Sequence, residues 1–286
     1  MPFRIKRSET PAKGLRRVGR ERVGAALDCL RQPGRPGAVH GARKEIKKLR
    51  ALFRLVRGEI KVRTYRKGVK ALRGAAECLA ATRDARVMFR AFEKLTGRRA
   101  GQFAHIERAL DKHARKEARR FRKDHSVVLA ERLLRKTHRR VGNWKIKLSG
   151  WPAIKPGLRQ SYQRGRDAWR RAARRAVPED FHAWRRHVKD LWYYFCLLYP
   201  VCPDATRASA DDLEHLAEEL GEDHDLFLLH EFTEKHCPAG SAQVRALDRL
   251  ITLRQRKLRA AALKLGARLY AETPVAFCRR LGQWRG

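Results

Sequence analysis

Apolar residues recur along this chain at intervals of three and four, the spacing of one face of an α-helix. Alternating runs of β-branched residues are few, and clusters of proline and glycine separate the periodic stretches. We therefore predict an all-α fold. The predicted helices cover residues 11–31, 37–58, 60–81, 84–96, 101–140 with a break near Asp124, 156–176, 179–199, 209–221, 224–236, 241–270 and a short segment from Pro274.

Four sequence anchors recur in the same order in the two halves of the chain. They are Gly14-Leu15-Arg16 with Gly157-Leu158-Arg159, His40-x-x-Arg43-Lys44-x-x-Lys47 with His182-x-x-Arg185-Arg186-x-x-Lys189, Leu79 and Asp84 with Leu220 and Asp225, and Arg139-Arg140-Val141-Gly142-Asn143-Trp144 with Arg279-Arg280-Leu281-Gly282-Gln283-Trp284. The position differences are 143, 142, 141 and 140, as single-residue deletions in successive loops would produce. We therefore predict an internal duplication. Residues 1–149 and 150–286 would each form a bundle of about four principal helices, related by a pseudo-twofold axis within one domain.

The helix predicted to begin near residue 37 has two faces of opposite character. With His40 at zero on a wheel of 100° per residue, basic side chains fall within one arc and apolar ones on the opposite side. The basic arc holds Arg43, Lys44, Lys47, Arg50 and Arg54; the apolar arc holds Ala42, Ile46, Leu49, Phe53 and Val56. One face is thus predicted to pack into a bundle while the other carries a file of cations about 21 Å long.

The second half repeats this pattern at a constant offset. Its cationic file is His182, Arg185, Arg186 and Lys189, and its apolar positions are Trp184, Val188, Leu191, Phe195 and Leu198. A solvated face could exchange Lys for Glu freely, so the repeated cations favour an anion-binding role, with both files facing a shared concavity. We expect Arg16 and Arg159 to join them. Trp192 and Tyr193 stand where the first half has Arg50 and Ala51, so the second file is shorter and partly aromatic.

Composition strengthens the case for a polyanionic partner. The 286 residues include 68 Lys and Arg against 30 Asp and Glu, a formal net charge of +38, while 43% are apolar. Such an excess of one charge repels itself, yet the apolar content argues against a disordered basic tail. The N-terminus lacks the apolar core of a secretory signal, and no stretch of about 18 uncharged apolar residues exists. With six cysteines but no CxxC pair, these features predict a reduced, cytoplasmic protein without a membrane partner.

No pattern in the sequence indicates catalysis or a resident cofactor. We find no Walker loop, nucleophile elbow or ordered Cys/His pair, so no catalytic residue is predicted. The acidic run from Asp211 to Asp225 lacks the ligand pattern of an EF-hand. We interpret it as a solvated face or a counterweight to neighbouring basic helices rather than a metal site. Asp84 and Asp225 are interpreted as N-caps or as partners of nearby arginines.

The paired histidine motifs resemble the conserved histidine α-helical domain, or CHAD, family. The resemblance covers nearly the whole chain and rests on the two motifs from His40 and from Phe181-His182, with Leu220-Gly221-Glu222-x-x-Asp225 and Arg83-Asp84 adding to it. It implies two four-helix bundles about a pseudo-twofold axis, with a basic surface and central channel that bind inorganic polyphosphate, in bacteria at polyphosphate granules. Some relatives also carry a triphosphate tunnel enzyme domain marked by Glu-x-Glu-x-Lys, a motif that does not occur here. Trp192 and His224-Asp225, in place of a cation and an Arg-Asp pair, depart from the symmetric pattern.

Two other functions stay open at this point. The high charge also fits a protein that binds single-stranded RNA or DNA, although such proteins set aromatic residues among their cations for base stacking. Here only Trp192, Tyr193 and Tyr162 are candidates for that role. A polyphosphate-processing enzyme ranks third. His40 and His182 have two equally favoured interpretations, as donors to phosphate or as hydrogen-bonding spacers between helices.

Overall fold

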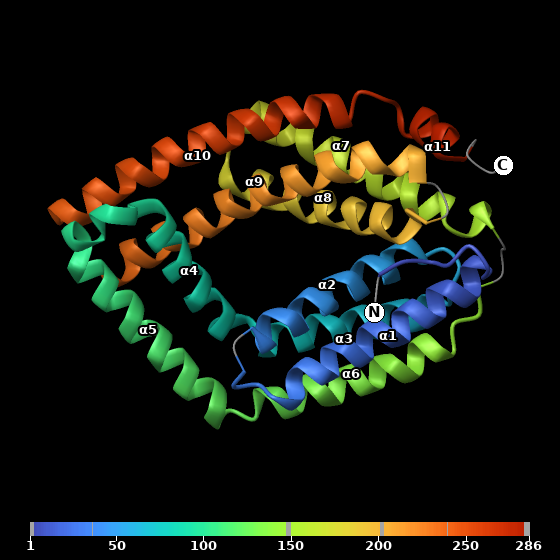
Figure 1. Cartoon of the computed structure of the whole chain (residues 1–286), viewed down its shortest axis with the longest axis horizontal. Coiled ribbons are helices and arrows are strands. Elements are labelled where there is room, and N and C mark those ends of the chain that lie inside the picture. The colour runs from blue at the N-terminus through green and yellow to red at the C-terminus, as the bar shows by residue number, and fades with distance from the viewer. Residues whose placement is uncertain (1–2, 36, 147–149, 201–202, 239, 283–286) are drawn as a thin grey trace.

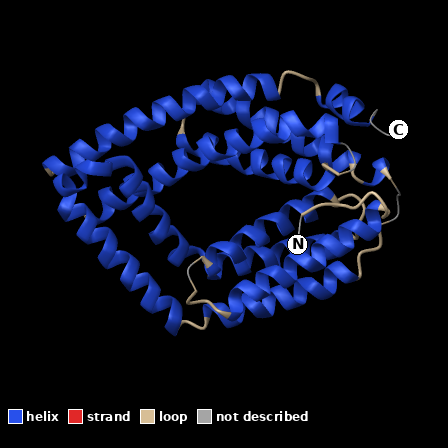
Figure 2. Cartoon of the chain, viewed as in Figure 1, coloured by secondary structure: helices blue, strands red, loops and turns tan. Residues whose placement is uncertain are grey.

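The all-α prediction is confirmed by the computed structural model, which describes residues 3–35, 37–146, 150–200, 203–238 and 240–282. Within these ranges the chain consists of helices and loops without a strand (Figure 2). The helices are α1 Pro11–Arg31, α2 Ala38–Leu55, α3 Val62–Cys78, α4 Ala80–Thr96, η1 Gly97–Phe103, α5 Ala104–Lys123, α6 Ser126–Gly142, η2 Trp151–Ala153, α7 Lys155–Arg175, α8 Pro178–Leu198, α9 Pro203–His236, α10 Ala242–Leu269 and α11 Pro274–Gly282. Gln283 and Trp284 of the fourth anchor, and Cys202, lie outside the described residues; the other five cysteines are free thiols.

Local sequence explains where several helices begin. Proline takes the first helical position of α1, α8 and α11, where its missing N–H is not needed. The Thr10 hydroxyl accepts a hydrogen bond from the Lys13 N–H at 3.4 Å, and Thr273 caps α11 through the Ala276 N–H at 3.2 Å. The break predicted near Asp124 is also confirmed, because α5 ends at Lys123 and His125 has a φ of 49° before α6 begins.

The predicted break between residues 221 and 224 is wrong, since α9 runs through it without interruption. A glycine in a helix interior costs only about 1 kcal/mol relative to alanine. Packing of α9 against α8, α10 and α4 offsets this cost. The guanidinium of Arg185 from α8 lies next to Gly221, at a distance where an added Cβ would be in ordinary van der Waals contact with it.

The helices form three packed groups that surround the middle of the molecule (Figure 1). In the first, α1, α2, α3 and α6 pack together; in the second, α7 and α8 pack with the first part of α9, the last part of α10 and α11. These two groups share the larger hydrophobic core. In the third group, α4, η1 and α5 pack against the far ends of α9 and α10 around a smaller core.

The smaller core combines both halves of the sequence. It joins Met88 and Phe92 of α4 to Leu229 and Phe232 of α9. The arm formed by α4 and α5 therefore packs on helices of the other half rather than only on its own bundle. The division at residue 150 into two duplicated bundles stays a prediction.

The apolar faces predicted for the two histidine helices are confirmed as core. Their ten residues are at most 4% exposed: Ala42, Ile46, Leu49, Phe53, Val56, Trp184, Val188, Leu191, Phe195 and Leu198. Polar bonds join the two helices where they meet. The Tyr194 hydroxyl donates to the Ala51 carbonyl oxygen at 3.0 Å, and Arg54 pairs with Asp190 at 2.5 Å. These contacts fix α2 against α8, and with them the direction of each basic face.

We expect Gly157→Ala to destabilise the protein. A Cβ on Gly157, at the start of α7, would overlap the backbone carbonyl oxygen of Leu55 at the end of α2, which cannot rotate away. The free energy of unfolding should fall by about 1–3 kcal/mol in urea titrations. Gly24→Ala in α1 is the matched control, because a Cβ there meets nothing within 4 Å and should be neutral or stabilising. Equal effects of the two substitutions would contradict the assignment of this close contact.

Candidate functional site

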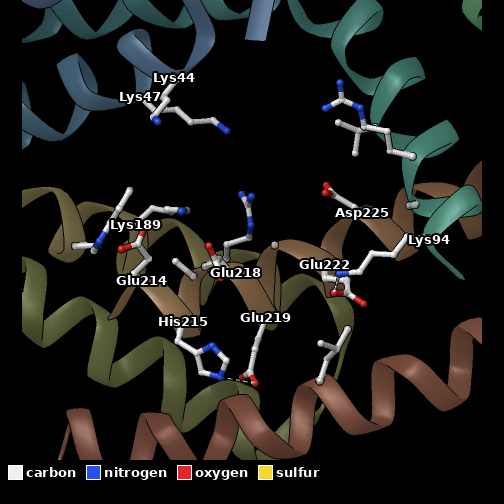
Figure 3. A pocket seen from close by; sticks show the side chains of 18 of the residues that line it. Lys44, Lys47, Lys94, Lys189, Glu214, His215, Glu218, Glu219, Glu222 and Asp225 are labelled. Carbon is white, nitrogen blue, oxygen red and sulfur yellow. Dashed lines mark hydrogen bonds and ion pairs between the residues drawn. The ribbon is translucent and has the colours of Figure 1, made fainter. Parts of the chain in front are cut away.

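A cavity of about 860 Å³ lies between α2, α4, α8, α9 and α10, and we call it the central cavity. Ten lysines and arginines line it against five carboxylates, so its wall is basic with one acidic side (Figure 3). The cations are Arg43, Lys44, Lys47, Arg83, Arg90, Lys94, Arg185, Lys189, Arg254 and Lys257, and the carboxylates are Glu214, Glu218, Glu219, Glu222 and Asp225. All five carboxylates belong to α9.

The first turns of α2 supply one wall of the central cavity. His40, Arg43, Lys44 and Lys47 all line it, as their common arc on the helix requires. Arg43 is anchored by donating from Nη1 to the Ala76 carbonyl oxygen at 2.6 Å, near the end of α3. Lys44 is exposed and Lys47 half-buried, and both project from α2 toward α9 (Figure 3).

Helix α8 supplies Arg185 and Lys189 from the opposite side. Arg185 lies against Gly221 of α9, and its Nε is buried without a hydrogen-bond partner among the described residues. The Lys189 ammonium sits 4.4 Å from the ring centroid of Trp192, one turn further along the helix. Cations from both histidine helices therefore meet in one cavity, although the sequence alone could not show that they do.

The sequence interpretation missed the contribution of α4 and α10. Arg83 donates to Asp84 at 2.9 Å and to Asp225 of α9 at 3.5 Å, which ties α4 to α9. This confirms the interpretation of both aspartates as arginine partners. Arg90 and Lys94 follow Arg83 at helical spacing, a signal that a wheel of this segment would have shown. For Arg254 and Lys257 no signal existed, because α10 carries basic residues on several faces.

Burial, and then the crowding of like charges, lowers the pKa values of basic groups in the central cavity. Burial, together with Arg185, Arg83, Arg43 and Lys189, lowers the pKa of Lys47 to about 7. Burial, then Lys47 and the cations near it, also lowers the pKa of the His40 imidazole. The pKa of Lys189 falls by burial and by the proximity of Arg185. The cavity therefore holds cationic groups whose charged forms lack enough counter-charge.

The acidic run on α9 offsets only part of this charge. Glu222 pairs with Lys94 and with Arg254 at 2.5 Å each, and Asp223 pairs with Arg259 at 2.7 Å, so the run does counter basic helices as interpreted. Glu219 contacts His215 at 3.3 Å (Figure 3). Within the described ranges no group of three or more histidines, cysteines and carboxylates is placed to hold a metal ion.

The cationic file on α2 does not stay in the cavity along its whole length. Arg50 and Arg54 do not line it. Arg54 is neutralised by Asp190 of α8. Burial, and then Arg54, lowers the pKa of Arg50. The file of about four turns expected to face one concavity is therefore divided: its first half lines the cavity and its second half follows the contact between α2 and α8.

The expectation that His40 and His182 face one concavity is wrong. His182 lines a separate hollow of about 350 Å³, which we call the histidine hollow, together with Pro178, Glu179, Arg186, Asp223, His224 and Phe227. Its Nδ1 lies 3.0 Å from the Nδ1 of His224. His182 has the same spacing from Arg185 as His40 has from Arg43, so the packing of α8 against His224 of α9, rather than the spacing along the helix, places His182 outside the central cavity. The hydrogen bond to His224 favours the spacer interpretation of His182.

Three further predicted residues lie away from the central cavity. Arg16 donates from Nη1 to the Trp144 carbonyl oxygen at 3.1 Å, a contact within the first group of helices. Arg159 is exposed on α7 and does not line the cavity. Tyr162 is fully buried and donates to the Leu269 carbonyl oxygen at 2.9 Å, so it is no stacking platform. Of the aromatic candidates, Trp192 and Tyr193 do line the cavity.

Comparisons with known proteins agree with this architecture. The crystal structure of the CHAD domain from the plant Ricinus communis is similar with a TM-score of 0.62, covering 99% of this chain and 96% of that chain at 17% identity. No curated protein matches the chain. None of the described helices combines the length and apolar character needed to cross a membrane. A model of the CHAD domain matches residues 20–234, most of the sequence, and the protein therefore belongs to the CHAD domain family.

Proposed function

We propose that the protein binds inorganic polyphosphate in the central cavity without transforming it. The observation that carries this proposal is the lining of the cavity, where ten lysines and arginines face five carboxylates. Burial, and then the cations around it, lowers the pKa of Lys47 to about 7. A cavity that confines so many like charges gains most from a ligand that supplies several negative charges at once. Membership of the CHAD family supports the same ligand.

The proposed contacts come from several helices rather than two files. Arg43, Lys44 and Lys47 on α2 face Arg185 and Lys189 on α8, with Arg83, Arg90 and Lys94 on α4 extending the wall. Arginine offers paired N–H groups to phosphate oxygens, and lysine acts as a mobile point charge. Arg50, Arg54, His182, Arg186, Arg16 and Arg159 would contribute at most long-range potential from their observed positions.

The proposal also covers the cellular location of the protein and the origin of its two halves. We place the protein in the cytoplasm, at polyphosphate granules where these exist, and we derive its two halves from a duplicated bundle. Of the five lysines in the cavity only Lys94 forms an ion pair among the described residues, which leaves Lys44, Lys47, Lys189 and Lys257 available to a ligand. Single-stranded nucleic acid is the second candidate, and the half-buried Trp192 is the observation that favours it.

Removing three of these lysines should weaken polyphosphate binding. For Lys44→Ala/Lys47→Ala/Lys189→Ala we expect the affinity for long-chain polyphosphate to fall at least about 100-fold in calorimetry, because charge-assisted contacts are lost. The log–log slope of affinity against salt should become shallower by about two units. Arg66→Ala/Lys67→Ala/Lys70→Ala replaces the same number of basic residues on the exposed surface of α3 and is the control. If the control loses as much affinity, net charge binds the ligand and the cavity does not.

Binding should be accompanied by proton uptake at Lys47. At pH 8 this lysine, with a pKa of about 7, is mostly neutral in the empty cavity, and a polyanion beside it would raise its pKa. Calorimetry in two buffers of different ionisation enthalpy should show an uptake at pH 8 that approaches one proton. Affinity should decline several-fold as the pH rises from 7 to 8, since the proton is harder to obtain. Lys47→Arg, which keeps its charge at pH 8, should bind with little uptake; unchanged uptake in this variant would rule out Lys47 as the group.

Competition should separate the two polyanions. Polyphosphate has no bases, so a cavity that holds mostly cations should prefer it to single-stranded RNA of equal charge, whose bases find few aromatic partners. We expect long-chain polyphosphate to displace labelled RNA at lower phosphate concentration than RNA displaces labelled polyphosphate, at one fixed salt concentration. The reverse order would make nucleic acid the ligand.

A further inference from the structure

A second hollow of about 510 Å³ opens next to the central cavity. Phe3, Trp192, Tyr193, Cys196 and Tyr199 give it apolar and aromatic walls, so we call it the aromatic hollow. Lys44, Trp192, Tyr193 and Glu214 line both spaces. The two are therefore neighbours that meet at these four side chains.

The polyphosphate proposal gives Trp192 no role. This indole stands where the repeat pattern of the first half has Arg50, so aromatic surface replaces a cation beside a basic cavity. It packs only partly against the core and is half-buried. Tyr193, tilted at 39° with its ring centroid 5.1 Å away, backs it, and Phe3 meets Tyr193 edge-on at 6.0 Å. The result is a braced aromatic wall that is still accessible.

Charged side chains surround this aromatic wall and could contact the polar parts of a ligand whose flat ring lies against it. The Lys189 ammonium lies over the Trp192 ring at 4.4 Å and also lines the central cavity, so a base that stacks on this face must displace it, and the displaced ammonium would remain beside the first phosphate. Asp211 and Glu214 line the aromatic hollow and offer carboxylate oxygens to hydroxyl or amino groups. Arg4 and Arg207, both exposed, also line the aromatic hollow and add positive charge to it.

We propose that the aromatic hollow and the central cavity together form a site for a nucleoside polyphosphate, with its base against Trp192 and its phosphate tail in the central cavity. The ribose would lie near Glu214, where the hollows meet, and the first phosphates near Lys44 and Lys189. Stacking on a tryptophan accepts any base but is strongest for purines, because their ring area is larger. This proposal rests on the proposed function, since the tail uses the same cations.

The test compares adenosine triphosphate with inorganic tripolyphosphate, which carries the same number of phosphorus atoms but no base. Calorimetry without divalent metal should show the nucleotide binding about tenfold more tightly to the parent protein. Guanosine triphosphate should bind as tightly as adenosine triphosphate, and the affinity of uridine triphosphate should lie between those of adenosine triphosphate and tripolyphosphate. Equal affinity for adenosine triphosphate and tripolyphosphate would overturn the proposal.

Substitution of the indole gives a second, independent readout. Trp192→Leu should weaken nucleotide binding by a larger factor than tripolyphosphate binding and so remove the preference for the nucleotide, and Trp192→Phe should restore part of that preference. Trp151→Leu is the matched control, because Trp151 is also half-buried but lines neither hollow. Circular dichroism would verify that each variant is folded. Equal weakening of both ligands by Trp192→Leu would refute base stacking at this position.

The same set of measurements distinguishes failure of the two proposals. If long-chain polyphosphate binds tightly and depends on Lys44, Lys47 and Lys189, but the nucleotide has no advantage, only the stacking site is wrong. If long-chain polyphosphate does not bind the parent protein at all, the proposed function fails first. If nucleotides bind and lose affinity with Trp192→Leu even then, the aromatic hollow is a site in its own right.

Discussion

The rest of the structure depends on the packing of α2 against α8, which holds like charges close together. Burying Phe53, Trp184 and the other apolar side chains of these helices contributes about 1.5–3 kcal/mol for each large residue. That apolar burial must overcome the repulsion among cations on the opposite faces. The repulsion is evident at Lys47, because burial and four neighbouring cations lower its pKa to about 7. This concentration of cations is electrostatically unfavourable in itself, and an anion among them would relieve the repulsion.

Acidic residues on α9 limit how far this repulsion goes. Asp225 forms an ion pair with Arg83 of α4, and Glu222 forms ion pairs with Lys94 of α4 and Arg254 of α10. These ion pairs join α9 to α4 and to α10, near the smaller hydrophobic core. They also leave part of the cationic wall unpaired, because Lys44, Lys47 and Lys189 form no ion pair with the described residues of α9. The mixture of neutralised and unneutralised cations gives the cavity both a defined shape and a residual positive charge.

The two histidines show why equivalent sequence positions need not have equivalent roles. His40 lines the central cavity, where burial and nearby cations lower its pKa. His182 instead meets His224 in a hollow of its own, and burial together with His182 lowers the pKa of His224 to about 3. Stability should therefore decrease as pH falls below the unfolded histidine pKa of about 6.5, because the unfolded chain then binds protons that the folded His224 cannot. The local partner, rather than the motif, decides what each imidazole does.

The amino-acid sequence by itself determined the helices, their apolar faces and the basic residues of α2 and α8, because helical periodicity depends only on the order of residues along one segment. It also gave the family resemblance that the match over residues 20–234 confirmed. It did not determine that α9 is continuous through Gly221, since packing by three neighbouring helices outweighs the local preference of glycine. Only the tertiary structure brought Arg83, Arg90 and Arg254 to the central cavity, placed His182 outside it and set Trp192 between the central cavity and the aromatic hollow. Those outcomes depend on the rotation of each helix and on contacts between residues more than a hundred positions apart, and no single helical segment encodes them.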